Sequence, residues 1–273
     1  MNTIILATDF SANATQAAHF AAQLANDQKA TLVLVHAYQA WPDNPAKTGD
    51  FPLSVNATRE DSETRLSNLA HDLTKTFGAY TPIRYLVMEG HASDVIRQIV
   101  QTENADLLVM ATIGTAPQSA RLMGSLATAM VAETTVPLLL IPPGRTYSRL
   151  KKVVLGIDLA SPPNALTLAT ALELTRTFGS TLNVICISDQ LDDPKTLEQV
   201  AQLNGLLGNH RHSLTIQASD DDIYALLLAF AHQTEADLIM MLPQAHNWLD
   251  SLFVEGETQR LARLTDIPLV AVV

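Results

Sequence analysis

Three residues in the N-terminal half have the types and spacing to hold a phosphorylated ligand. Gly114 follows the apolar run 106–110, and after nine further residues Gly124 and Ser125 open the next apolar stretch. A glycine lets the backbone approach a phosphate closely, and the free N–H groups at the start of a helix favour an anion. The Ser125 hydroxyl can add one more donor. The spacing therefore predicts a phosphate site between a strand and a helix.

A carboxylate stands at the end of another apolar run. Asp9 follows the run 3–8, and a carboxylate would repel phosphate. Its expected role is to accept a hydrogen bond from an adenine amino group or a ribose hydroxyl, at the opposite end of a nucleotide. His36 ends the next apolar run and is expected to be a core or supporting polar residue, not a catalytic base. With no general base or set of metal ligands beside the glycines, we expect no catalytic residue, no metal site and at most slow ATP hydrolysis.

The elements that would position these residues alternate along the chain. Apolar runs predict strands at 3–8, 31–37, 83–88, 106–111 and 137–141, and helical patterns lie between them at 13–26, 54–77, 92–103 and 121–134. Ser11 or Asn13 is expected to cap the first helix. Strands that alternate with helices form parallel sheets covered on both faces, which bind ligands at the carboxyl ends of the strands.

The pattern occurs twice in the 273 residues. The segment 3–38 is echoed by 151–188, 104–111 by 235–242, and 134–142 by 265–273, and the second copy is shorter between its second and third strands. A Pro/Gly/polar linker at 142–150 separates the copies. We therefore expect an α/β protein with two tandem open, mostly parallel five-stranded sheets flanked by helices, and domains at 1–145 and 150–273.

These motifs resemble those of the universal stress protein family. The resemblance rests on a first strand that ends in TDFS and on the Gly, nine residues, Gly-Ser spacing, and it covers nearly the whole chain as two tandem domains. It implies an adenine-nucleotide alpha-hydrolase-like (Rossmann-like) fold and a stress-response regulatory protein that binds ATP or AMP, with or without Mg, in its first domain. Ala111 stands where the family pattern has its first glycine. Alanine is a mild departure, whose methyl group leaves less room for a phosphate to approach the backbone without blocking it.

The resemblance also implies which residues surround the nucleotide. It places Ala7, Thr8, Asp9 and the backbone of Ala37 around the base, and it places Met110, Ala111, Gly114, Gly124, Ser125 and Leu126 around the ribose and phosphates.

The second copy departs further from the phosphate pattern. Asp158 matches Asp9, but Glu255 and Gly256 occupy the place of Gly124 and Ser125, and no glycine precedes them in the stretch 241–255. A carboxylate at the phosphate position is repulsive. The sequence therefore predicts that the second domain has lost triphosphate binding and either packs as a partner or holds a different ligand.

Composition excludes several classes of partner. The net charge of −11 argues against duplex nucleic acid and anionic membranes, and the apolar runs are too short to span a bilayer. The single cysteine, Cys186, has no partner for an internal disulfide, and the first residues read as a strand and not a signal peptide. We therefore expect a cytoplasmic protein.

Two other functions and two modes of assembly can be weighed against the same residues. A nucleotide-free protein-interaction module with vestigial pockets, acting on an unknown protein partner, is the alternative to nucleotide binding. An ATP-dependent ligase or sulfurtransferase of this fold group would carry Ser-Gly-Gly-x-Asp-Ser after the first strand. This chain has TDFSAN there, which argues against that function. The last strands of the two domains are expected to pair within the chain as a pseudo-dimer, and a homodimer is the other form of assembly.

Overall fold

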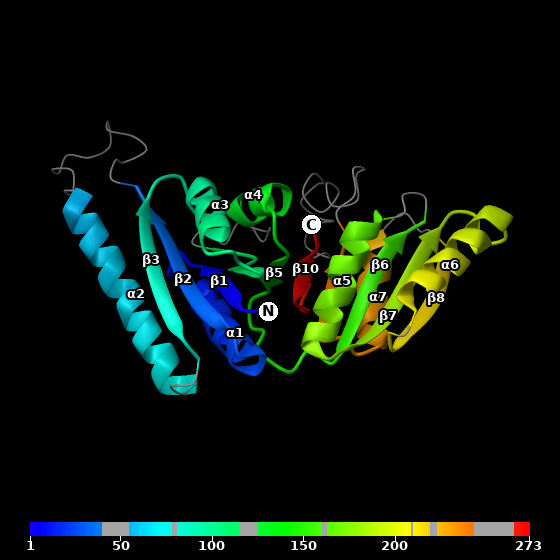
Figure 1. The fold of residues 1–273 in the computed structure, drawn as a ribbon, viewed down its shortest axis with the longest axis horizontal. Helices are drawn as coiled ribbons and strands as arrows, with labels where there is room; N and C mark the ends of the chain where they lie inside the picture. Colours follow the sequence, from blue (N-terminus) through cyan, green and yellow to red (C-terminus); the bar gives the residue numbers. More distant parts are fainter. Residues whose placement is uncertain are drawn as a thin grey trace. The chain divides into compact units, whose positions relative to one another are not determined.

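The computed structural model describes residues 1–39, 55–77, 81–114, 125–159, 163–208, 210–218, 223–242 and 265–273. These residues form two compact units, which divide between Tyr147 and Ser148. In each unit helices flank a five-stranded sheet (Figure 1), and the strand pairs described within the units are parallel. The structure confirms the predicted fold class of two tandem α/β sheets.

The first unit has the strand order β3-β2-β1-β4-β5. Its strands are β1 (Thr3–Ala7), β2 (Thr31–Tyr38), β3 (Ile83–Glu89), β4 (Leu107–Ala111) and β5 (Leu138–Ile141). Its helices are α1 (Ala12–Gln28), α2 (Val55–Phe77), α3 (Ala92–Thr102) and α4 (Ser125–Glu133). Helix α1 packs beside α2, and α3 beside α4. This grouping fits right-handed crossovers that place the two pairs on opposite faces of the sheet.

The second unit repeats this topology with the order β10-β9-β6-β7-β8. Its strands are β6 (Lys152–Asp158), β7 (Thr181–Ser188), β8 (His212–Ala218), β9 (Leu238–Met241) and β10 (Leu269–Ala271). Its helices are α5 (Ala165–Phe178), α6 (Pro194–Leu207) and α7 (Ile223–Gln233). Helix α6 has 14 residues against 23 in α2, which confirms the predicted shortening between the second and third strands.

Apolar runs and polar caps explain why these elements form where they do. All residues of β5 and β9 are buried, as a strand covered by helices on both faces requires. Of the two predicted caps for α1, Ser11 is the one used, and its Oγ accepts a hydrogen bond from the Ala14 N–H at 3.1 Å. In α5 the side chain of Asn164 caps the helix in the same way, by accepting from the Thr167 N–H at 2.8 Å.

A repeated aspartate joins the first and fourth strands of each unit. Asp106, just before β4, accepts a hydrogen bond from the Thr3 N–H at 3.0 Å. Asp237, just before β9, accepts from the N–H groups of Lys151 and Lys152 at 2.9 and 3.0 Å. The Asp-Leu motif that recurs in both copies therefore fixes the amino ends of neighbouring strands, at the edge opposite to the one where ligands bind.

The strand order reverses between β1 and β4, so a crevice is expected at their carboxyl ends. The helices of the described ranges also bear on membrane insertion. None of them is both long enough and apolar enough to cross a bilayer.

Candidate functional site

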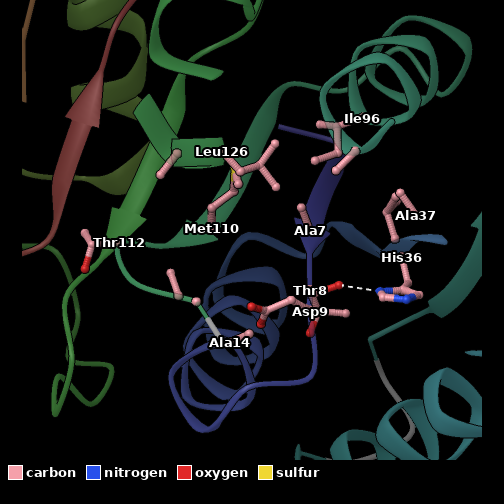
Figure 2. Close-up of a pocket in the computed structure, with 15 residues that line it drawn as sticks. Ala7, Thr8, Asp9, Ala14, His36, Ala37, Ile96, Met110, Thr112 and Leu126 are labelled. Carbon is pink, nitrogen blue, oxygen red and sulfur yellow. Dashed lines mark hydrogen bonds between the residues drawn. The ribbon is translucent and has the colours of Figure 1, made fainter. Parts of the chain in front are cut away.

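A pocket of about 270 Å³ lies in the first unit, at the carboxyl ends of β1, β2 and β4. Helices α1, α3 and α4 complete its walls (Figure 2). The lining residues are Ala7, Thr8, Asp9, Ala14, Val35, His36, Ala37, Ala92, Ile96, Met110, Ala111, Thr112, Gly114, Leu126 and Ala127. The walls are mostly apolar and carry a few polar groups, which is the usual composition of a small-molecule site.

Eight of the ten residues predicted from the sequence line this one pocket. They are Ala7, Thr8, Asp9, Ala37, Met110, Ala111, Gly114 and Leu126. Gly124 lies outside the described residues, and Ser125 begins α4 but its side chain is likewise outside them. The structure thus brings the residues predicted to surround the base and those predicted to surround the ribose together around one pocket.

Seven lining residues were not among the predicted site residues, although His36 was expected to be a core or supporting polar residue. They are Ala14, Val35, His36, Ala92, Ile96, Thr112 and Ala127. The sequence did contain a signal for Val35 and His36 on β2, because these residues directly precede the predicted site residue Ala37. For the residues on α3 there was none, since the helical pattern does not show which turn reaches the strand tips.

Asp9 is held just beyond the end of β1. Its Oδ1 accepts a hydrogen bond from the Ser11 N–H at 3.0 Å, and Ser11 in turn caps α1. Between them Phe10 has φ 60°, in the left-handed region that a bulky side chain rarely adopts. This turn takes Asp9 out of the strand and places it among the pocket residues (Figure 2).

The structure differs from the sequence prediction in the place of Asp9 relative to Gly114. The prediction set the carboxylate and the glycines at opposite ends of the ligand. Instead, a Cβ built on Gly114 would overlap Asp9 Oδ2 and lie 3.3 Å from Asp9 Cγ. The left-handed turn at Phe10, which directly follows Asp9, is a feature that the residue pattern does not reveal. Gly114 therefore leaves room for a carboxylate.

His36 lines the pocket beside Asp9. Its Nδ1 lies 2.8 Å from the carbonyl oxygen of Thr8, and because a carbonyl can only accept, Nδ1 carries the proton. Burial lowers the pKa of His36, and the positive charge of Arg65 lowers it further, while the bond to Thr8 and the charge of Asp9 act in the opposite direction. The neutral imidazole is thus favoured, and the ring serves as a fixed polar wall of the pocket.

In the second unit larger side chains occupy the corresponding positions. The two copies align at Asp9 and Asp158, at the first residues of β2 and β7, and at the first residues of β4 and β9. On this alignment, Thr8, Ala37 and Ala111 are replaced by Ile157, Ile187 and Leu242, each at most 2% exposed. Larger, buried apolar side chains thus stand at the described strand ends of the second unit, where the first unit borders a pocket.

One contact shows how closely helix α7 packs against strand β6 in the second unit. Gly156 corresponds to Ala7, and a Cβ at Gly156 would lie 3.2 Å from Leu227 Cδ1. Leu227 is the fifth residue of α7, as Ile96 is of α3, and it is 1% exposed. The predicted loss of triphosphate binding rested on Glu255 and Gly256, which lie outside the described residues. The loss of triphosphate binding therefore stays a prediction, to which the larger side chains at the strand ends are relevant.

Asp158 also differs from its counterpart Asp9. It is the last residue of β6, and the next residue, Leu159, still donates its N–H to Ile187 O at 2.9 Å. Cys186 takes the place of His36 and is fully buried, and burial raises the pKa of its thiol to about 12. This thiol is an inert core residue at neutral pH.

The parallel sheets, and a pocket where the strand order reverses, define a Rossmann-like α/β protein with two tandem units. Solved structures share this fold over the whole chain. A universal stress protein from Archaeoglobus fulgidus DSM 4304 matches with a TM-score of 0.71 and 16% identity, covering 99% of this chain and 95% of that one. A protein described as functionally unknown, from Pseudomonas aeruginosa PAO1, matches with a TM-score of 0.65 and 13% identity, covering 100% and 92%.

Sequence comparison gives the family. The model of the Universal stress protein family matches residues 1–142. A universal stress protein of Thermus aquaticus is 32% identical over 139 residues, which are 51% of this chain and 97% of that protein. The chain belongs to the universal stress protein family, as a tandem form with two units of the same fold.

Proposed function

We propose that the first unit binds an adenine nucleotide, ATP or AMP, and that the protein acts as a nucleotide-dependent regulator without a catalytic role. The single observation that carries this proposal is the convergence of eight predicted residues on one pocket. Apolar walls suit a base, while the Asp9 carboxylate offers an acceptor for an amino group or a ribose hydroxyl. Gly124 and Ser125 remain the proposed donors to phosphate.

Replacement of Asp9 tests the proposal directly. Asp9→Ala is expected to weaken AMP and ATP binding by roughly ten- to hundredfold, because hydrogen bonds to a charged group contribute about 1.5–3 kcal/mol. Isothermal titration calorimetry measures the affinity, for which a micromolar value is expected in the unaltered protein. Asp158→Ala is the matched control and should leave it unchanged. Absence of heat with millimolar AMP and ATP in the unaltered protein would refute nucleotide binding.

Replacement of Gly114 tests the contact between its backbone and Asp9. Gly114→Ala is expected to displace the Asp9 carboxylate and to weaken binding about as much as Asp9→Ala, since the added Cβ would overlap Asp9 Oδ2. In an Asp9→Ala background the same change should lower the nucleotide affinity little further, because the carboxylate that the added Cβ would overlap is absent. Gly205→Ala in α6, where nothing lies within 4 Å of the added Cβ, is the control. Equal losses in both backgrounds would contradict this role of Gly114.

The alternative is an interaction module whose pocket stays empty. Ala111 at the place of the first glycine and the filled strand tips of the second unit favour it. Denaturing the purified protein and measuring the released adenine absorbance, alongside the calorimetry, separates the two functions. An interaction module releases no adenine and gives no heat with either nucleotide.

We also propose that the last strands, β5 and β10, form the intramolecular contact of a pseudo-dimer. Each is the outermost strand of the five-stranded sheet of its own unit, and such a strand presents backbone groups that can pair. Light scattering of the whole chain distinguishes a monomer, in which these strands pair internally, from a homodimer.

A further inference from the structure

The segment that carries Asp9 is held by contacts that its counterpart in the second unit lacks. The Phe10 N–H donates to Thr8 Oγ1 at 3.0 Å, which closes the left-handed turn. The Phe10 ring lies 4.4 Å from the His36 ring, and the Arg65 guanidinium carbon lies over it at 4.1 Å from the ring centroid. Side chains from β2 and α2 thus fix the residue that directly follows Asp9.

His36 contacts both neighbours of Asp9 at once. Its Nδ1–H donates to the carbonyl oxygen of Thr8 at 2.8 Å, and its ring packs on Phe10 (Figure 2 shows the hydrogen bond). The residues on either side of Asp9 are therefore tied to one imidazole. Asp9 itself is oriented by the Ser11 N–H, which donates to Oδ1 at 3.0 Å.

The second unit shows what the same aspartate does without these contacts. Ile157, Leu159 and Cys186 stand where the first unit has Thr8, Phe10 and His36, and all three are buried. None of their side chains offers the hydroxyl, the aromatic ring or the ring N–H used in the first unit. There the strand continues through Asp158, and Leu159 N–H donates to Ile187 O.

From this comparison we infer that His36 and Phe10, supported by Arg65, are positioning residues that hold the Asp9 carboxylate out of the strand and at the pocket. The inference rests on the proposed function for its effect on nucleotide binding. It assigns His36 a role through Asp9, with no need for direct contact between the imidazole and the nucleotide. Arg65 acts through Phe10.

The first test exchanges these residues for those of the second unit. His36→Cys and Phe10→Leu are each expected to weaken AMP binding about tenfold, the effect of losing one well-placed hydrogen bond or ring contact. In an Asp9→Ala background neither change should weaken binding further, because both act through the carboxylate. Cys186→Ala in the second unit is the matched control and should leave the affinity unchanged. Full additivity with Asp9→Ala would overturn the inference.

A conservative variant separates the two contacts of His36. The amide nitrogen of an asparagine occupies nearly the position of Nδ1, so His36→Asn can keep the hydrogen bond to Thr8 while losing the ring contact with Phe10. We expect it to restore part of the affinity lost in His36→Cys. A thermal melt of each variant, followed by circular dichroism, shows that the fold is retained.

A readout in the ligand-free protein keeps the inference testable apart from nucleotide binding. The Ser11 amide proton reports on the Asp9 carboxylate that accepts its hydrogen bond, and its NMR chemical shift should move in Asp9→Ala and in His36→Cys alike. If the unaltered protein binds neither AMP nor ATP, the proposed function fails and this shift alone decides the positioning role. An unchanged Ser11 shift in His36→Cys would overturn it.

Discussion

Ala111→Leu is expected to lower the affinity for AMP and ATP by roughly a hundredfold or more, which is the largest effect expected of a single change at the pocket. Ala111 lines a cavity of about 270 Å³ that has little room to spare for a nucleotide. Leu242 at the corresponding place in the second unit is 1% exposed, so the fold accommodates a leucine there. Calorimetry of the variant measures the loss.

A matched control shows that the loss comes from filling the pocket. Ala201→Leu makes the same change on an exposed position of α6 and should leave binding unaltered. The thermal melt of Ala111→Leu should stay close to that of the unaltered protein. Retained affinity in a folded Ala111→Leu protein would show that a nucleotide, if bound, lies elsewhere.

Leu227→Ala is expected to destabilise the second unit by about 2–5 kcal/mol, the usual cost of removing a buried leucine and leaving a cavity. Leu227 is 1% exposed and packs against Gly156, where it closes the strand tips. Hydrogen exchange followed by mass spectrometry can measure this free energy on peptides of β6 and α7, apart from the first unit.

The neighbouring glycine supplies the internal check. Gly156→Ala alone is expected to destabilise, since its Cβ would lie 3.2 Å from Leu227 Cδ1, and it should recover part of the loss when combined with Leu227→Ala. Leu197→Ala, at a side chain 53% exposed on α6, should change stability by less than about 0.5 kcal/mol. Equal exchange in Leu227→Ala and in the unaltered protein would contradict the packing role of this leucine.

The elements of the first unit could be predicted from the sequence almost to the residue. Apolar runs such as 107–110 are buried strands, and a serine before an alanine-rich stretch marks the start of α1. Most predicted bounds fall within two residues of those observed, because burial and capping are local properties of the sequence. The predicted start of the fourth helix at 121 lies outside the described residues, and α4 is described from Ser125.

The candidate site was predictable to the extent that parallel strands bring their carboxyl ends together. Asp9, Ala37 and Ala111 follow from this rule and from the family resemblance. The contact between Asp9 and Gly114 could not be predicted, since it depends on the left-handed backbone of Phe10 and on an imidazole from another strand. The phenylalanine at position 10 does not signal such a turn, because glycine or asparagine is the usual residue in the left-handed region.

The larger side chains at the strand ends of the second unit are visible in the sequence itself. Reading the two copies side by side gives isoleucine for Thr8 and Ala37 and leucine for Ala111, a consistent gain in size at the ends of three strands. The predicted loss of triphosphate binding rests instead on the charge of Glu255. Side-chain volume at the strand ends, compared between the two copies, is therefore a second sequence property that bears on the space left for a ligand.

The pocket of about 270 Å³ between the strand ends and the helices of the first unit affects the thermal stability of that unit. Two halves with one architecture need not melt together, because the first borders a pocket and the second carries larger buried side chains at the corresponding strand ends. A molecule bound in this pocket would stabilise the folded first unit and raise the melting temperature of the N-terminal half alone. The C-terminal half, in which larger buried side chains stand at three of the strand ends, would serve as the internal reference against which such a shift is measured.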